Sequence, residues 1–215
     1  MPSKYVVRNY IEGGIYHIYN RGVEKRRIFM SNQDYKIFIY YFFIYITPLA
    51  KVLASYPNLP FRLQQKNLSK EVEVLTYCLM PNHFHFLLKQ NSKDGITKFM
   101  KQITNAYTEY FNKKYKRDGG LMQGKYKAAT IESDKILIHI SRYIHLNPVV
   151  AGLCEKIYEY QWSSINEFIN NKEILCNTKP ILEKFSSSKK YETFILDHLD
   201  YARELENIKH ASIDE

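Results

Sequence analysis

The chain has 215 residues, a length that suits one domain with an ordinary hydrophobic core. Hydrophobic residues make up 45% and charged residues 25%, so the composition is that of a folded globular protein and not of a disordered one. No apolar run approaches the roughly 20 residues that a membrane-spanning helix needs, and the first residues lack the apolar core of a signal peptide. We therefore expect a cytoplasmic protein with no membrane contact.

Basic charge and tyrosine stand out in the composition. There are 31 Lys and Arg against 22 Asp and Glu, a net charge of +9, together with 19 tyrosines. Residues 98–127 contain eight basic and two acidic side chains, whereas residues 183–215 contain five and eight. Basic charge interleaved with aromatic rings suits a surface that follows phosphates and stacks unpaired bases, although a basic protein with a tyrosine-rich core has the same composition.

The predicted elements alternate between strands and helices. Alternating apolar and polar side chains predict strands at residues 15–19, 71–79, 83–89 and 122–131. Helical spacing predicts helices at about residues 32–45, 95–110 and 134–146. Ser31 with Asp34 resembles a capping box at the first helix, and Pro148 is expected to end the last one.

This order of elements predicts the fold class. A strand, helix, strand, strand, helix, strand, helix order fits an α+β, ferredoxin-like split β-α-β plan, an antiparallel sheet with helices on one face. In the strand at 71–79, alternation places Val72, Val74 and Cys78 on one face. We expect residues 1–165 to form this domain, and residues 166–215 to form a helical extension that packs on the body or on a second subunit.

Two histidines alternate in the third predicted strand, as His83-Phe84-His85. Residues two apart on a strand project to the same side, so both imidazoles share one face while Phe84 turns to the other. Two such imidazoles form half of a metal site. The alternative is a pair of surface histidines on an exposed sheet face.

Tyr143 and Asn147 are four residues apart in the last predicted helix and share a face. The phenolic oxygen of tyrosine acts as a covalent nucleophile in some enzymes, and the amide oxygen of asparagine suits a hard cation. The alternative is a core tyrosine followed by an ordinary residue at the helix end. His139 lies on the same face, and an unremarkable helix position is the simpler interpretation for it.

Several motifs together resemble one known family. Residues 80–88 (MPNHFHFLL), 123–127 (QGKYK) and 142–149 (RYIHLNPV), with 16–22 (YHIYNRG) and 160–164 (YQWSS), are similar to the HUH single-tyrosine transposases. Within that group the chain most resembles the REP-associated tyrosine transposases. The resemblance covers roughly residues 10–165 and implies the HUH endonuclease fold.

The resemblance also implies roles for particular residues. His83, His85 and Asn147 correspond to the metal ligands, with Mg²⁺ or Mn²⁺ as the cofactor, and Tyr143 corresponds to the nucleophile. The implied activity is cleavage and rejoining of single-stranded or hairpin DNA through a 5′-phosphotyrosine. Other interpretations are a DNA-binding protein without catalysis and a phosphodiesterase that uses water.

Basic and aromatic side chains are the predicted DNA contacts, although each is also explained as a solvated charged face. We expect phosphate or base contacts from Arg21, Lys25, Arg26, Arg27, Lys113, Lys114, Lys116, Arg117, Lys125, Tyr126 and Lys127. The sequence leaves open whether the protein is a monomer or a homodimer.

Overall fold

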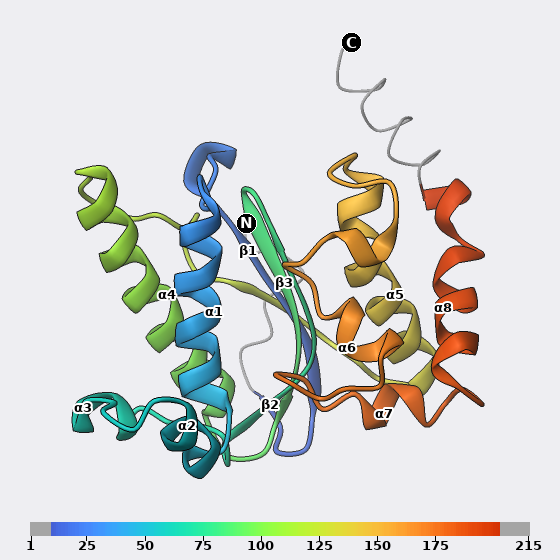
Figure 1. Ribbon diagram of the computed structural model, residues 1–215, viewed down its shortest axis with the longest axis horizontal. Coiled ribbons are helices and arrows are strands. Elements are labelled where there is room, and N and C mark those ends of the chain that lie inside the picture. The colour runs from blue at the N-terminus through green and yellow to red at the C-terminus, as the bar shows by residue number, and fades with distance from the viewer. Residues whose placement is uncertain (1–9, 203–215) are drawn as a thin grey trace.

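The computed structural model describes residues 10–202, and a four-stranded antiparallel sheet lies at its centre (Figure 1). The strands are β1 (Ile15–Arg21), β2 (Val72–Met80), β3 (His83–Gln90) and β4 (Lys127–Thr130). Their order in the sheet is β2-β3-β1-β4, with each neighbouring pair antiparallel. The first strand is therefore central, as the split β-α-β plan requires, and the predicted α+β class is confirmed. The prediction that the helices lie on one face is wrong, because helices pack on both faces of the sheet.

Two long helices cover one face of the sheet. These are α1 (Asn32–Ile46) and α4 (Gly95–Tyr115), which lie side by side in Figure 1. Phe84 and Phe86 of β3 are fully buried beneath them, and the ring of Phe86 stacks on Phe42 of α1 at 5.2 Å between centroids. Each such buried ring contributes roughly 1.5–3 kcal/mol, so this core fixes which face of β3 carries the phenylalanines and leaves the histidines to the other.

The opposite face of the sheet is covered by α5 (Asp134–Val150), which packs on β2 and β3. On the same side of the sheet lie α6 (Ile165–Ile169), α7 (Lys179–Leu182) and α8 (Ser188–Leu196). Ile144 of α5, Phe168 of α6 and Tyr191 of α8 share a second core. The expected packing of the C-terminal segment on the body is thus confirmed for the part of the chain that the structure describes.

Short helices fill the connections. They are η1 (Val23–Lys25), α2 (Leu49–Ser55), α3 (Phe61–Gln64) and η2 (Ile157–Glu159). Pro48 and Pro60, which marked a long connection in the sequence, occupy the N-cap positions of α2 and α3. The predicted box at the start of α1 is present, because the backbone N–H of Ser31 donates to the Asp34 carboxylate at 2.9 Å.

A bulge in β2 makes one detail of the predicted strand pattern wrong. The register against β3 shifts between Val74 and Thr76, so the extra residue moves every later side chain to the other face. Val72 and Val74 belong to the core under α1 and α4, whereas Cys78 belongs to the core under α5. The fourth strand is also shorter than predicted, and Met122 forms only an isolated bridge with Gly22.

The prediction that Pro148 ends the last helix is also wrong. The helix α5 continues to Val150, with Pro148 inside its last turn. Proline removes a single backbone hydrogen bond at this position, and the turn is closed by the bonds from Ala151 to Asn147 and from Leu153 to Pro148, both 2.9 Å. Asn147 consequently keeps its helical position one turn after Tyr143.

Candidate active site

His83 and His85 lie at the start of β3 on the face that α5 crosses. Across the ladder His83 pairs with Arg21, and His85 pairs with Tyr19, so β1 contributes side chains to the same surface. His85 is 5% exposed, and its neighbour His83 is partly exposed. The two imidazole rings meet edge to face at 4.9 Å between centroids.

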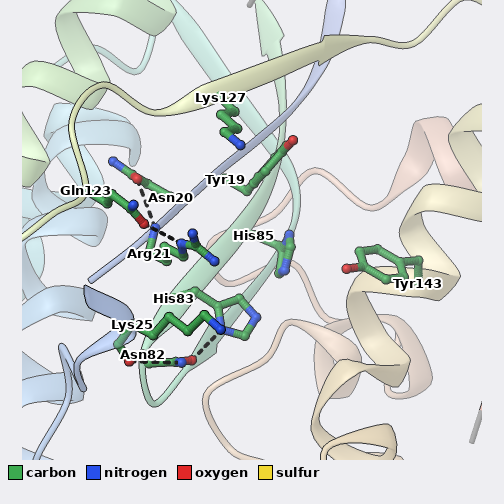
Figure 2. A pocket seen from close by; sticks show the side chains of 10 residues that line it. All are labelled: Tyr19, Asn20, Arg21, Lys25, Asn82, His83, His85, Gln123, Lys127 and Tyr143. Atoms are coloured by element: carbon green, nitrogen blue, oxygen red, sulfur yellow. Dashed lines mark hydrogen bonds between the residues drawn. The ribbon is translucent and has the colours of Figure 1, made fainter. Parts of the chain in front are cut away.

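Tyr143 approaches these histidines from α5. Figure 2 shows its ring on the far side of the cavity with the hydroxyl directed toward His85. The two rings meet edge-on, 5.4 Å apart between centroids and inclined by 83°, and Tyr143 is 49% exposed. Tyr143 thus combines contact with His85 and access from solvent.

One cavity of about 600 Å³ contains the histidines and the tyrosine together. Its wall carries three cationic side chains, three amides and a second tyrosine. The lining residues are Tyr19, Asn20, Arg21, Lys25, Asn82, His83, His85, Gln123, Lys127 and Tyr143. The space, the charge and the exposed phenol suit a phosphate diester on an unpaired strand.

Asn147 lies one turn beyond Tyr143 on the same helix. Its Nδ2 donates to the Tyr143 carbonyl at 2.7 Å, which leaves its Oδ1 as the atom that accepts a cation. Asn147 lines an adjoining cavity of about 400 Å³ that also reaches His83 and Tyr143. His83, His85 and Tyr143 therefore line one cavity, and Asn147 lines a second one that shares His83 and Tyr143 with the first.

Burial keeps the site histidines neutral. Desolvation, with a contribution from Arg21, lowers the pKa of His83 to about 4. Desolvation, together with the neighbouring His17 and His83, holds the pKa of His85 well below its ordinary value. Neutral imidazole is the form that binds a metal ion, so both rings are in that form at neutral pH.

A cation is implied by the family resemblance, and the donor atoms fit one. Among residues 10–202, no group of three His, Cys, Asp or Glu side chains could hold a metal, so two imidazoles need oxygen ligands from elsewhere. The amide oxygen of Asn147 is of the right chemical type for such a ligand, and phosphate or water would supply the rest. Mixed nitrogen and oxygen donors suit Mn²⁺ or a later metal better than Mg²⁺.

The predicted DNA contacts divide into two groups. Arg21, Lys25 and Lys127 line the cavity of the histidines. Outside that cavity lie Arg26, Arg27, Lys113, Lys114, Lys116, Arg117, Lys125 and Tyr126. Contact with DNA stays a prediction for both groups.

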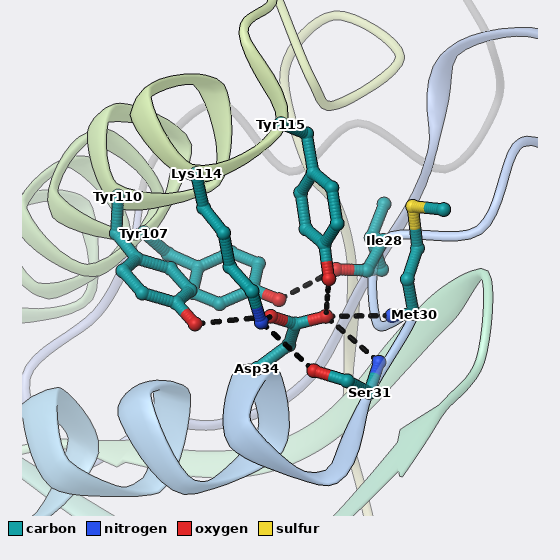
Figure 3. Close-up of polar contacts among 8 residues, drawn as sticks. All are labelled: Ile28, Met30, Ser31, Asp34, Tyr107, Tyr110, Lys114 and Tyr115. Atoms are coloured by element: carbon teal, nitrogen blue, oxygen red, sulfur yellow. Dashed lines mark hydrogen bonds and ion pairs between the residues drawn. The ribbon is translucent and has the colours of Figure 1, made fainter.

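Two of the outer cations already have acidic partners. Arg26 pairs with Glu24 at 3.0 Å, and Lys114 pairs with Asp34 at 2.6 Å. Figure 3 shows Asp34 enclosed between α1 and α4, where it also accepts the hydroxyls of Tyr110 at 3.0 Å and Tyr115 at 2.8 Å. Lys114 is therefore part of a structural network that joins the two helices.

Several residues that line the cavity or contact its histidines were not predicted from the sequence. Asn82 accepts from His83 Nδ1 at 2.7 Å, Gln123 accepts a hydrogen bond from the Arg21 Nε, and His17 contacts His85. The alternation of β1 contained the signal for His17, because it is two residues before Tyr19 and four before Arg21. The register of β1 against β3, which the sequence does not specify, is what brings it to His85.

Comparison with known proteins shows what the central part of the chain is similar to. Residues 58–147 match the model of a family described as "Transposase IS200 like", a span that contains His83, His85, Tyr143 and Asn147. The resemblance to the single-tyrosine transposases is therefore confirmed over this span.

Two particular proteins are similar to this chain. The chain is 26% identical, over 141 residues, to a Haemophilus influenzae protein assigned as a REP-associated tyrosine transposase, covering 60% of this chain and 80% of that one. Its fold matches a solved structure of a REP-associated tyrosine transposase bound to a REP hairpin, with a TM-score of 0.53 and 18% identity over 80% of this chain and 89% of that one. No helix among the described residues is long and apolar enough to cross a membrane.

Proposed function

We propose that this protein cleaves and rejoins single-stranded DNA next to hairpins, using Tyr143 as the nucleophile. The observation that carries the proposal is the placement of Tyr143 edge-on to His85, in one cavity with His83 and with the cations of Arg21 and Lys127. A hairpin substrate is supported by the structural neighbour, which is bound to a REP hairpin.

His83, His85 and Asn147 would hold a divalent cation in this proposal. When bound, that cation supplies Lewis-acid polarisation of the scissile phosphate. The Nδ1 atoms of both histidines are engaged in hydrogen bonds, to Asn82 at 2.7 Å and to His17 at 2.9 Å, so their Nε2 atoms are the ones left for ligation. Arg21 and Lys127 on the same wall are placed to hold phosphate oxygens.

The reaction on this site is a transesterification. The hydroxyl of Tyr143 gives up its proton and attacks phosphorus while the bond from phosphorus to the 3′-oxygen breaks. The leaving 3′-oxygen takes up a proton, and the phosphate becomes a 5′-phosphotyrosine. Because one phosphate ester replaces another, a second 3′-hydroxyl can reverse the step and join two strands. The exposure of Tyr143 gives the strand access to the attacking oxygen.

The test uses labelled oligonucleotides that contain a hairpin next to a single-stranded segment. Wild-type protein with Mn²⁺ or Mg²⁺ should give a band that migrates as a protein–DNA adduct in a denaturing gel. Tyr143→Phe should bind the hairpin and give no adduct, whereas Tyr158→Phe, which changes an equally exposed tyrosine away from the cavity, should cleave normally. His83→Ala should also give no adduct.

The other interpretations predict different results in the same gel. Binding without any cleavage by the wild-type protein would mean a DNA-binding protein that lacks catalysis. Cleavage without an adduct, which persists in Tyr143→Phe, would mean a phosphodiesterase that uses water. Either result contradicts the proposal.

A further inference from the structure

His17 is a buried imidazole next to the proposed metal site. It lies on the central strand β1, is 8% exposed, and places its Nε2 2.9 Å from the Nδ1 of His85. The rings of His17 and His85 stack at 5.1 Å between centroids with 21° between their planes. The ring of Tyr19 also stacks on the ring of His17, at 5.0 Å between centroids. The ring of His17 is therefore held in one orientation relative to His85.

A hydrogen bond between two neutral imidazoles has two forms that differ in where the protons sit. In one form the Nδ1–H of His85 donates to the Nε2 of His17, and the His85 Nε2 carries a lone pair. In the other form the His17 Nε2–H donates, and the proton of His85 resides on its Nε2. Because a ligand nitrogen must be unprotonated, only the first form leaves the Nε2 of His85 able to bind a cation.

His83 shows the same arrangement with a partner whose role is fixed. Asn82 donates its Nδ2 to the Lys25 carbonyl at 3.3 Å, so its Oδ1 is the atom that faces His83 Nδ1 at 2.7 Å. An amide oxygen only accepts, and His83 must therefore donate through Nδ1. Both histidines then present Nε2 toward the space beside Tyr143, provided that His17 acts as the acceptor for His85.

We propose that His17 is a positioning residue that accepts the Nδ1–H of His85 and thereby holds the Nε2 of His85 ready for the cation. This inference rests on the proposed function, because it assigns His85 as a ligand. It adds a residue outside the histidine motif, and it predicts that the acceptor atom of His17 matters more than its ring.

Two variants separate the acceptor from the ring. His17→Phe keeps a flat ring for stacking but has no acceptor, whereas His17→Gln loses the ring and keeps an oxygen that accepts. The first readout is the nitrogen chemical shifts of the His85 ring, measured by NMR without metal at one neutral pH and assigned from the signal lost in His85→Gln. Wild type and His17→Gln should show His85 protonated on Nδ1, and His17→Phe should shift it toward protonation on Nε2.

The second readout is the affinity for Mn²⁺ in the absence of DNA, measured by calorimetry. Loss of such an outer hydrogen bond weakens metal binding by about 10–100-fold, so we expect that loss in His17→Phe and a smaller one in His17→Gln. Mn²⁺ binding that is unchanged in His17→Phe overturns the role of His17 alone. A wild-type protein that binds no Mn²⁺, or binds it equally well as His83→Ala, overturns the proposed metal site and the role of His17 with it.

The wild-type spectrum also tests the proposal without any variant. If His85 in the unsubstituted protein carries its proton on Nε2, then His17 is the donor and the proposal is wrong. This measurement keeps its meaning even if His17→Phe does not fold.

Discussion

The Nδ1 of His145, two residues beyond Tyr143 on α5, lies 2.8 Å from the phenolic oxygen of Tyr191 on α8. The hydroxyl of Tyr191 donates to the hydroxyl of Ser141 at 3.1 Å, one turn earlier on α5. The Nε2 of His145 lies 2.7 Å from the hydroxyl of Ser164, just before α6. The buried side of α5 is thus tied to the C-terminal helices, while its other side carries Tyr143 into the cavity.

Removing the Tyr191 hydroxyl should loosen this attachment. In Tyr191→Phe the ring still fills the core, but His145 and Ser141 each lose a partner, so we expect the free energy of unfolding to fall by about 1–2 kcal/mol. Because Tyr143 is held by the same helix, the rate of adduct formation should fall while the affinity for hairpin DNA stays within twofold. Urea unfolding and single-turnover cleavage measure the two effects.

Tyr158→Phe is the matched control, since Tyr158 is 46% exposed and its hydroxyl lies outside this network. It should match wild type in both assays. Adduct formation by Tyr191→Phe at the wild-type rate would show that α8 does not position the nucleophile.

The cations of the cavity should dominate the salt dependence of DNA binding. Each phosphate contact on a single strand contributes about −0.7 to the slope of log K against log salt concentration. Replacing Arg21, Lys25 or Lys127 singly with Gln should reduce the slope by about that amount, because all three line the cavity. Fluorescence anisotropy over a salt series gives the slopes.

Lys70→Gln serves as the control for this series. Lys70 is exposed and lies just before the first residue of β2. The turn to His83 follows the other end of that strand. The slope of log K against log salt concentration for Lys70→Gln should equal that of wild type. Equal slopes for all four variants would mean that DNA binds elsewhere on the basic surface.

The Asp34 network should make stability depend on pH in acid. Desolvation acts to raise the pKa of Asp34. Hydrogen bonds from Lys114, Tyr115 and the backbone outweigh this effect and hold the pKa below its ordinary value of 3.8. A carboxyl whose folded-state pKa is lowered stabilises the fold above its unfolded value, and this stabilisation is lost as the pH falls through the folded value. Wild type should therefore lose this contribution below about pH 4.

Asp34→Asn should lower the free energy of unfolding by about 2–3 kcal/mol at pH 7, a figure reduced because Lys114 is partly exposed. The difference from wild type should shrink at pH 3. Asp134→Asn is the control, since its ion pair with Lys184 is mostly solvated, and it should cost less than about 1 kcal/mol at both pH values. If the free energies of unfolding of Asp34→Asn and wild type differ by the same amount at both pH values, the ionised Asp34 carboxylate does not stabilise the fold.

The sequence predicted the features that depend on residues close together in the chain. The alternation of His83 and Phe84 predicted their opposite faces, and the helical spacing of Tyr143 and Asn147 predicted that they share a surface. The bulge in β2 and the continuation of α5 past Pro148 were not predictable, because they depend on packing against other segments. His17 was missed for the same reason, since strand pairing alone brings it to His85.

The most direct test of the central claim is to locate the DNA attachment by mass spectrometry. Trypsin cuts after Arg142 and Lys156, and the peptide between them, residues 143–156, contains Tyr143 as its only tyrosine. After reaction with a hairpin and nuclease digestion, this peptide should carry the mass of a 5′-linked nucleotide, and the modification should vanish in Tyr143→Phe. A nucleotide found on any other peptide, or one that remains in Tyr143→Phe, would contradict the assignment of Tyr143 as the nucleophile.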